Sequence, residues 1–410
     1  MNDQENHSTE IKQYSLITGN YWAFTLTDGA LRMLVVLHFH QLGYSPLQIA
    51  LLFLFYEFFG VVTNLIGGWL GARLGLNKTM NIGLGLQIVA LSMLLIPTDY
   101  LSVLWVMMAQ ALSGIAKDLN KMSAKSAVKL LVSDEQQGKL YNWVSLLTGS
   151  KNTLKGVGFF MGGMLLGIFG FQGAVAIMAG LLLLVWIGSL IYLKKDMGKA
   201  TTKPKFNEIF SKSSAVNILS AARLFLFASR DVWFVVALPV FLAAELDWTH
   251  IQIGSFLAAW VIGYGTVQSM TPQITANISD QVPDGGSVFM WALMLCTIPG
   301  VIALALNAGI KPELALVLGL MIFGILFAIN SALHSYLIIS YASADGVSLD
   351  VGFYYMANAM GRLTGTVLSG WIFQAYGLIA CLWVSTGFIA ISAVIAAMLP
   401  KHKQQADSSD

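Results

Sequence analysis

Charged residues are scarce in this sequence. Aspartate, glutamate, lysine and arginine together make up 11% of its 410 residues, whereas hydrophobic residues make up 56%. Soluble proteins carry about 25% charged residues. A chain of this length has room for two or three soluble domains, but its composition excludes them and favours a protein embedded in a membrane.

Cysteine is rarer still, with only Cys296 and Cys381. They fall in different predicted helices and no CxxC motif is present, so we expect neither a zinc site nor a disulfide framework. Catalytic motifs are missing as well, since the sequence has no HExxH, no GxSxG and no phosphate-cradling loop. We therefore expect no enzyme activity, no metal and no cofactor. The net charge of +2 comes from scattered bases, so nucleic acid is not an expected partner.

Apolar windows of about 20 residues, long enough to span a bilayer, recur along the whole chain. The pattern predicts an all-α polytopic membrane protein with twelve transmembrane helices in two six-helix bundles. The predicted spans are 16–40, 46–72, 79–98, 102–126, 139–168, 172–194, 215–242, 250–274, 286–307, 313–338, 351–375 and 377–399.

Basic residues predict the orientation of the chain, because they concentrate on the cytoplasmic side of a membrane. They gather between alternate spans, in a central basic segment and in the tail, whereas only Lys311 falls on the other side. We expect a multi-pass protein of the inner (plasma) membrane with both termini in the cytoplasm. The first 15 residues lack the apolar core of a signal peptide, so the first helix would direct its own insertion. The predicted divisions are an N-terminal bundle, a cytoplasmic linker, a C-terminal bundle and a cytoplasmic tail, at 1–194, 195–213, 214–400 and 401–410.

Two stretches suggest that the bundles arose by duplication. "GYSPLQIALLF" (43–53) precedes the second span and "DWTHIQIGSFL" (247–257) precedes the eighth, at a constant offset of 204. In addition, "GGWLGARLGLNK" (67–78) resembles the loop motif of the major facilitator superfamily, with Ala72 in place of its usual acidic residue. The resemblance implies two bundles that rock about a site near the middle of the membrane.

Charged residues inside the predicted spans are candidates for that site, because they are costly in a bilayer unless they face a cavity or a partner. In the fourth span, Lys117 and Asp118 lie within the hydrocarbon core and either pair with one another or bind substrate. We expect Lys125 and Lys129, farther along, to reach the cytoplasm by snorkelling. In the fifth span, Lys151 and Lys155 lie one turn apart with no acid on their own helix, which favours an aqueous cavity that receives an anion, a structural pair being the alternative.

The first predicted span (16–40) and the seventh (215–242) carry arginines close to aspartates. Asp28 and Arg32 are four residues apart and can form an intrahelical ion pair. Arg230 and Asp231 are adjacent, point about 100° apart and should need different partners. Arginine suits phosphate-like or carboxylate oxygens, so these arginines either bind the anionic ends of a substrate or stabilise packing with their aspartates. Secondary candidates, for binding, gating, hydrogen bonding or coupling, are Arg223, Glu57, Arg362, Asn152 and His334.

Positive charges outnumber negative ones in these spans, and a multiply charged anion would supply the missing counterions. This predicts an anionic substrate rather than a cationic drug. The candidate binding residues are Arg32, Lys117, Lys151, Lys155, Arg223 and Arg230, and the candidate coupling or ion-pair residues are Asp28, Glu57, Asp118 and Asp231. Proton antiport would use Asp28, Glu57 or Asp118, and the residues leave uniport and phosphate exchange equally open.

Four long stretches resemble the organoarsenical efflux permeases (ArsJ family), and the likeness spans nearly the whole chain. They are "GNYWAFTLTDGALRMLVVLHFHQLGYSP", "LSGIAKDLNKMSAKSAVKLLV", "LTGSKNTLKGVGFF" and "LSAARLFLFASRDVWFVVALP". The resemblance implies arsenate resistance by export of 1-arseno-3-phosphoglycerate, which glyceraldehyde-3-phosphate dehydrogenase makes when it uses arsenate. That enzyme is thus an implied functional partner, alongside the lipid bilayer and the small anionic substrate.

Two other transport functions stay open, and two further classes of protein are disfavoured. A general organophosphate or organic-anion exchanger would use the same charges, and a proton-coupled drug exporter would use the same fold. A membrane-embedded enzyme lacks its motifs, and a transporter-like sensor lacks an appended soluble domain. Two isolated cysteines also give trivalent arsenic no thiolate cluster, which disfavours an arsenite pump.

Overall fold

The computed structural model describes residues 2–44, 52–132, 135–193, 197–200, 213–278 and 281–401, with side chains from residue 11 onward. Within these ranges the side chains of Glu57 and a few others are not described, and the predicted linker and tail fall largely outside them. The described chain is helical throughout, which confirms the predicted all-α fold.

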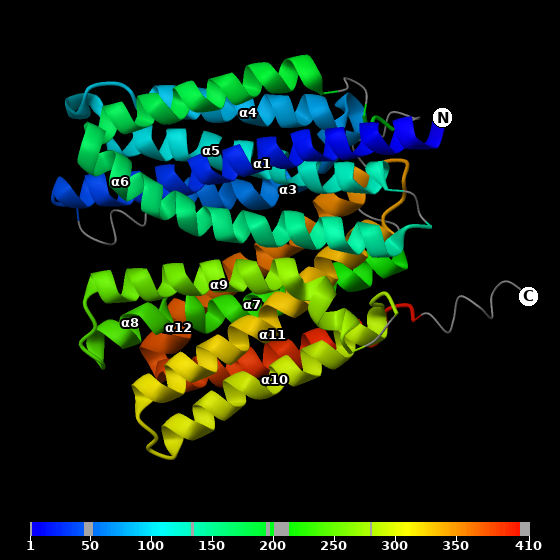
Figure 1. The fold of residues 1–410 in the computed structure, drawn as a ribbon. Coiled ribbons are helices and arrows are strands. Elements are labelled where there is room, and N and C mark those ends of the chain that lie inside the picture. Colours follow the sequence, from blue (N-terminus) through cyan, green and yellow to red (C-terminus); the bar gives the residue numbers. More distant parts are fainter. Residues whose placement is uncertain are drawn as a thin grey trace, which may run out of the picture. The chain divides into compact units, whose positions relative to one another are not determined.

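The N-terminal half begins with five helices and one short 3₁₀ turn, and the helices run alongside one another (Figure 1). They are α1 (Asn2–Gln41), α3 (Leu54–Leu74), α4 (Leu76–Met93), η1 (Thr98–Tyr100), α5 (Val103–Leu131) and α6 (Gln137–Tyr192). Gly75, at φ 99°, joins α3 to α4 without an intervening loop. Helix α6 is long enough to cross a bilayer twice, because its backbone leaves the helical conformation at Gly170 (φ 66°). This break lies between the predicted spans 139–168 and 172–194.

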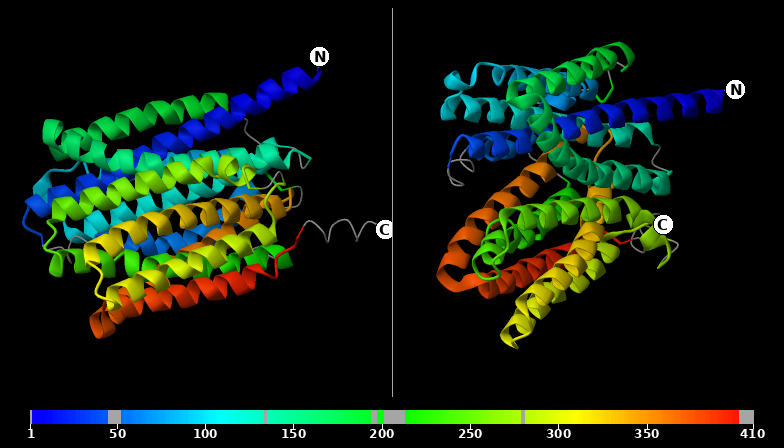
Figure 2. Two further views of the ribbon diagram at one scale, coloured as in Figure 1. Left: turned by 60° about the horizontal axis from the view of Figure 1, so that its bottom comes forward. Right: turned by 60° about the vertical axis from the view of Figure 1, so that its left-hand side comes forward.

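The C-terminal half repeats this plan. Its helices are α7 (Ser214–Phe234), α8 (Ala237–Ala244), α9 (His250–Ala276), α10 (Gly285–Asn307), α11 (Pro312–Tyr341) and α12 (Val347–Ala396). Helix α12 turns back at Gly377 (φ 78°), as the views in Figure 2 show. Capping boxes begin α9 at Thr249 and α10 at Asp284, where each side chain satisfies a backbone donor of the first turn.

Packing divides the chain into two compact units whose boundaries differ from those of the two sequence halves. Unit 1 comprises Met1–Trp143, Ser150–Ser211 and Ala342–Met356, and unit 2 comprises Val144–Gly149, Lys212–Tyr341 and Ala357–Asp410. The first turns of α12 thus belong with unit 1. There Ser348 Oγ donates to the carbonyl of Gly68 on α3 at 2.7 Å, and Gly352 faces Gly68 with no room for a Cβ.

In each unit, two glycines four residues apart on one helix pack against the backbone of another helix. In unit 1, Gly158 and Gly162 of α6 lie directly against the backbone of α1 between Leu26 and Ala30. In unit 2, Gly361 and Gly365 of α12 lie against the α7 backbone at Leu224 and Ala228. Small residues four apart let helices approach closely where lipid offers no hydrophobic driving force. The repeated crossing supports the inferred duplication and brings the charged segments of α6 and α12 beside those of α1 and α7.

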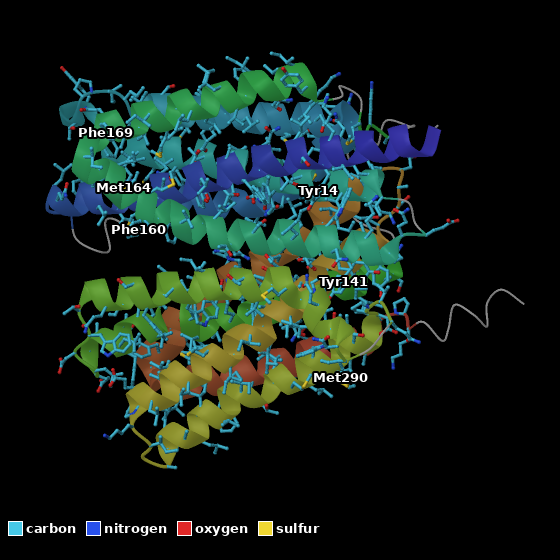
Figure 3. All side chains as sticks on the ribbon, viewed as in Figure 1. Tyr14, Tyr141, Phe160, Met164, Phe169 and Met290 are labelled. Carbon is cyan, nitrogen blue, oxygen red and sulfur yellow. The ribbon has the colours of Figure 1, made fainter. Side chains whose placement is uncertain are left out.

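The outer faces of the helices are apolar. Figure 3 labels Phe160, Met164 and Phe169 along α6, and their side chains are 79%, 49% and 53% exposed. By length and apolar composition, five helical stretches of the described chain can cross a membrane, namely Gln137–Tyr192, Ser214–Ala244, Gly285–Asn307, Pro312–Tyr341 and Val347–Ala396. Exposed apolar side chains on such helices suit contact with hydrocarbon.

Candidate substrate-binding site

Charged and phenolic side chains from three helices meet inside unit 1 and form what we call the N-terminal cluster. Helix α1 contributes Tyr21, Asp28 and Arg32, α3 contributes Tyr56, and α5 contributes Lys117, Asp118 and Lys121. Tyr56 lies at its centre, because its hydroxyl donates to Asp28 Oδ1 at 2.7 Å while its ring lies under two cations. Arg32 Cζ is 4.8 Å and Lys117 Nζ is 3.8 Å from the centroid of that ring. Such cation–π contacts contribute about 0.5–2 kcal/mol each, more when they are desolvated.

One expectation about this cluster needs correction, namely the pairing of Lys117 with Asp118. Asp118 pairs with Lys121, whose Nζ lies 2.6 Å from its Oδ1, whereas Lys117 lies over the Tyr56 ring. Lys121 is three residues from Asp118, about one helical turn, so its ammonium group and the carboxylate lie on the same face of α5. Asp28 takes its hydrogen bond from Tyr56, a partner that sequence spacing on α1 does not predict. The side chain of Glu57 lies outside the described residues, so its role stays a prediction.

The lysines farther along α5 do not reach water as predicted. Lys125 is 3% and Lys129 is 7% exposed, so both are buried within the protein. Lys125 Nζ lies 5.1 Å from the ring centroid of Tyr355 on the first turns of α12, and Lys121 Nζ lies 4.7 Å from the same centroid. Because those turns pack with unit 1, they help to cover Lys125, which the positive-inside rule would leave to solvent.

Lys151, Asn152 and Lys155 lie on the stretch of α6 that crosses α1. At one end of the stretch Trp22 Nε1 donates to Ser150 Oγ at 2.8 Å. At its other end a Cβ on Gly29 would lie 2.8 Å from the carbonyl oxygen of Lys155. The three side chains are half-buried, and Lys155 Nζ is 5.8 Å from the ring centroid of Phe159. The crossing therefore sets this stretch beside the segment of α1 that carries Asp28, and a role in binding stays a prediction.

Unit 2 holds a second set of charges, the C-terminal cluster, built around Asp231. Its Oδ1 lies 2.6 Å from Arg230 Nη2, and its Oδ2 lies 3.3 Å from Arg362 Nε on α12. Asp231 is fully buried, whereas the side chains of Arg230 and Arg362 are 16% and 37% exposed. The expectation that Arg230 and Asp231 need different partners is wrong, because the long arginine side chain folds back onto the neighbouring carboxylate.

Arg223 lies deeper in the same unit. Its Nε donates to Asn358 Oδ1 at 2.8 Å, its Nη1 donates to the carbonyl of Ser331 at 3.2 Å, and its Cζ lies 4.0 Å from the ring centroid of Phe227. Both of these hydrogen-bond acceptors are neutral. His334 is fully buried nearby, and neither ring nitrogen has a hydrogen-bond partner within the described chain.

The aromatic members of these clusters were missed by the sequence reasoning. Tyr56, Tyr21 and Tyr355 are ordinary in an apolar span, and a tyrosine costs little there. One signal was available for Tyr21, which precedes Asp28 by two helical turns and therefore shares its face. Nothing in the sequence connects Tyr355 to the lysines of α5, because that contact depends on how α12 folds against unit 1.

Long apolar helices that enclose charged clusters in two repeated units are typical of an integral membrane protein. The chain belongs to the Major Facilitator Superfamily, whose family model matches residues 17–236. No curated protein is significantly similar to it in sequence.

Solved structures share the fold at low identity. The human organic anion transporter MFSD10 (TETRAN) is 15% identical, with a TM-score of 0.74 over 94% of this chain and 99% of that one. The Escherichia coli fucose:proton symporter FucP is 12% identical, with a TM-score of 0.74 over 95% and 98%. A bacterial homologue of the iron transporter ferroportin, in an outward-facing state, is 13% identical, with a TM-score of 0.73 over 93% and 98%.

Proposed function

We propose that this transporter exports a phosphorylated organic anion, and that the anion is 1-arseno-3-phosphoglycerate. The observation that carries the proposal is that cations outnumber carboxylates among the described side chains of the two clusters. In the two clusters and around Arg223 the described carboxylates are Asp28, Asp118 and Asp231, whereas the carboxylate of Glu57 lies outside the described side chains. The described cations are Arg32, Lys117, Lys121, Arg223, Arg230 and Arg362. Charged side chains inside a bilayer line a cavity or contact a partner, and a set of mostly basic side chains suits an anion with several charges better than a cation.

The fold alone does not choose the substrate, because the similar structures include an organic anion transporter, a fucose symporter and an iron transporter homologue. The choice of an organoarsenical rests on the resemblance to organoarsenical permeases and on the charges together. A phosphate at one end and an acyl arsenate at the other offer oxygens to lysine and arginine donors. A general organophosphate exchanger is the second candidate, since it would use the same cations.

In the proposed cycle, Lys151, Lys155 and Arg230 bind the anionic ends of the substrate, and Arg32 and Lys117 assist. Asp28 and Asp231 hold the cations between cycles and are displaced by the substrate. Displacement is favourable only if the substrate's oxygens replace each contact, because a buried ion without a partner costs several kcal/mol. Export from the cytoplasm across the inner membrane would lower intracellular arsenic and confer arsenate resistance.

Arsenic uptake into everted membrane vesicles tests the function. Vesicles containing the protein receive either arsenate alone or arsenate with glyceraldehyde-3-phosphate, NAD and the dehydrogenase. We expect uptake only from the complete mixture. Equal uptake from arsenate alone would mean that the protein carries the inorganic oxyanion, and the organoarsenical assignment would fail.

The site is tested by Lys151→Gln and Arg230→Gln in cells challenged with arsenate. Both variants should lose resistance at normal expression, because each removes a cation that contacts an anionic end. Lys139→Gln is the matched control, since Lys139 lies near the start of the same helix α6 and stacks on Trp143, with its Nζ 4.8 Å from the ring centroid. Full resistance in both site variants would show that the binding residues lie elsewhere.

A further inference from the structure

One carboxylate oxygen in the N-terminal cluster has no donor. Asp118 is 2% exposed, and its Oδ1 accepts from Lys121 Nζ at 2.6 Å. Its Oδ2 has no hydrogen-bond partner in the part of the chain that the structure describes. A buried acceptor left unpaired costs about 1–3 kcal/mol, and more when it is charged. Oδ2 is therefore suited to accept a hydrogen bond from a group that arrives from outside the protein.

Tyr21 supplies a second unpaired group in the same cluster. Its side chain is 2% exposed, and its hydroxyl has no hydrogen-bond partner among the described residues. It lies within electrostatic range of Asp118, Asp28 and Tyr355. Asp28 Oδ1 already accepts from Tyr56, whereas the Tyr21 hydroxyl keeps a donor and two lone pairs for another group.

Gly60 on α3 keeps the surroundings of Asp118 Oδ2 clear. A Cβ at this position would lie 3.2 Å from Oδ2, and nothing else described lies within 4 Å of that Cβ. A side chain at this position would therefore crowd Oδ2. Lys121 contacts Oδ1 of the same carboxylate, and Lys117 lies over the Tyr56 ring.

The chemistry of these two groups selects an uncharged polar partner. A carboxylate oxygen repels phosphate, arsenate and carboxylate oxygens, but it accepts readily from an alcohol. A phenol donates to the oxygen of the same alcohol. We infer that Asp118 and Tyr21 form a subsite for an alcohol group on the transported anion, so that the substrate is a hydroxylated organic anion. This inference rests on the proposed function and adds to it a recognition element for the middle of the substrate, between its charged ends.

Paired ligands that differ by one hydroxyl test the subsite. Binding of 3-phosphoglycerate and of 3-phosphooxypropionate, which has the same charged groups without the alcohol, is measured calorimetrically with the full-length protein in nanodiscs. The wild type should bind 3-phosphoglycerate roughly 10- to 100-fold more tightly, as expected for a hydrogen bond to a charged acceptor. In Asp118→Asn and Tyr21→Phe the preference should shrink to less than about threefold, mainly through weaker binding of 3-phosphoglycerate.

Binding of 3-phosphooxypropionate is the internal control, because a misfolded variant would lose both ligands. Should Asp118→Asn fail to fold after losing its contact with Lys121, Tyr21→Phe still decides the question, since it removes one oxygen and keeps the ring. Tyr14→Phe is the matched control on the same helix, since the Tyr14 hydroxyl donates to the carbonyl of Trp143, and it should keep the preference. Equal affinity of the wild type for both ligands would overturn the subsite alone. Failure of the wild type to bind either ligand would overturn the proposed phosphorylated anion as well.

Discussion

Asp231 Oδ1 lies 2.6 Å from Nη2 of Arg230, the residue that precedes it in the chain. The other oxygen of the same carboxylate lies 3.3 Å from Arg362 Nε, so one buried acid holds two arginines from different helices. Gly365, one turn beyond Arg362, packs against the Cβ of Asp231 and the carbonyl of Ala228. The ion pairs and the close helix crossing therefore support each other, and substrate oxygens that compete for the arginines would act on the contact between α7 and α12.

Replacing the shared acid should destabilise the protein. Asp231→Asn leaves two guanidinium groups without their carboxylate, and breaking a buried pair costs about 3–5 kcal/mol. Because the two arginine side chains are partly exposed, we expect a smaller loss of about 1–3 kcal/mol. Thermal unfolding of the purified protein, followed by tryptophan fluorescence, measures it. The exposed acid Glu245 in the same unit offers the control Glu245→Gln, which should change stability by less than about 0.5 kcal/mol. Equal unfolding of both variants would mean that the bridge contributes nothing.

The two arginines should contribute unequally to the stability of the protein. Arg230 is closer to Asp231 and more buried than Arg362, so Arg230→Gln should lower the unfolding temperature more than Arg362→Gln does. A greater loss from Arg362→Gln would reverse this ranking and place the stronger contact on α12.

The glycine crossings should not tolerate a methyl group. A Cβ at Gly361 would overlap the carbonyl of Leu224, and a Cβ at Gly162 would overlap that of Ala30. Overpacking of this kind costs about 1–3 kcal/mol, so Gly361→Ala and Gly162→Ala should lower expression and the unfolding temperature. Gly370→Ala and Gly167→Ala are controls on the same two helices, because a Cβ there meets nothing within 4 Å. Those controls should be neutral or slightly stabilising, since alanine is the better helix former.

The sequence predicted the fold well because the hydropathy signal is strong and simple. A run of apolar residues from 137 to 192 is far longer than a bilayer needs, so it had to be divided, and the predicted gap at 169–171 contains the break at Gly170. In α12 the break at Gly377 falls one residue beyond the predicted gap at 376, on the first residue of the predicted span 377–399. The superfamily follows from this pattern and from the loop motif, and the family match over residues 17–236 confirms it.

The candidate site was predictable only in part. A charged residue in an apolar span is conspicuous, so Asp28, Asp118 and Asp231 could be selected from the sequence. Their partners could not, because a long flexible side chain such as that of Arg230 reaches an acceptor that lies about 100° away around the helix. The sequence does not single out Tyr56, because its importance lies in the two cations over its ring, and those cations come from other helices.

The docking of residues 197–200, in the central segment between the two halves, should depend on one glycine. Met197 and Ala200 form backbone hydrogen bonds of 2.8 Å with Leu76 and Ala72 at the junction of α3 and α4. Ala72 is the residue that replaces the usual acid of the superfamily loop motif. Gly198 (φ 73°) lies between them, and a Cβ there would be 2.5 Å from Leu76 Cδ1. Gly198→Ala should therefore release the segment. Limited proteolysis with trypsin should then cleave it faster than in the wild type.

Gly43→Ala separates backbone strain from packing in this experiment. Gly43 also has a positive φ, of 84°, but a Cβ there meets nothing within 4 Å, so its cost is the conformational strain alone, about 1–2 kcal/mol. If both variants leave the cleavage rate of the central segment unchanged, the docking of Gly198 on Leu76 does not hold this segment in place.

Tyr56 should act through its hydroxyl and its ring separately, and two substitutions distinguish them. Tyr56→Phe removes the donor to Asp28 but keeps the ring under Arg32 and Lys117, whereas Tyr56→Leu removes both. Loss of the donor to a buried carboxylate should cost about 1–3 kcal/mol of stability, and loss of the ring should cost about 0.5–2 kcal/mol more. Thermal unfolding of the two variants gives both values.

A double-mutant cycle then assigns the first of these costs to the contact with Asp28. If the hydroxyl acts through that carboxylate, Tyr56→Phe should be nearly neutral when Asp28 is already replaced by asparagine, with a coupling of about 0.5–3 kcal/mol. An equal cost of Tyr56→Phe in both backgrounds would show that the hydroxyl stabilises the protein through another group. The single variant Tyr56→Phe should also weaken binding of 3-phosphoglycerate. It removes the donor to Asp28 but keeps the charge of Asp28, and the unsatisfied carboxylate then competes with the anion for the cations Arg32 and Lys117.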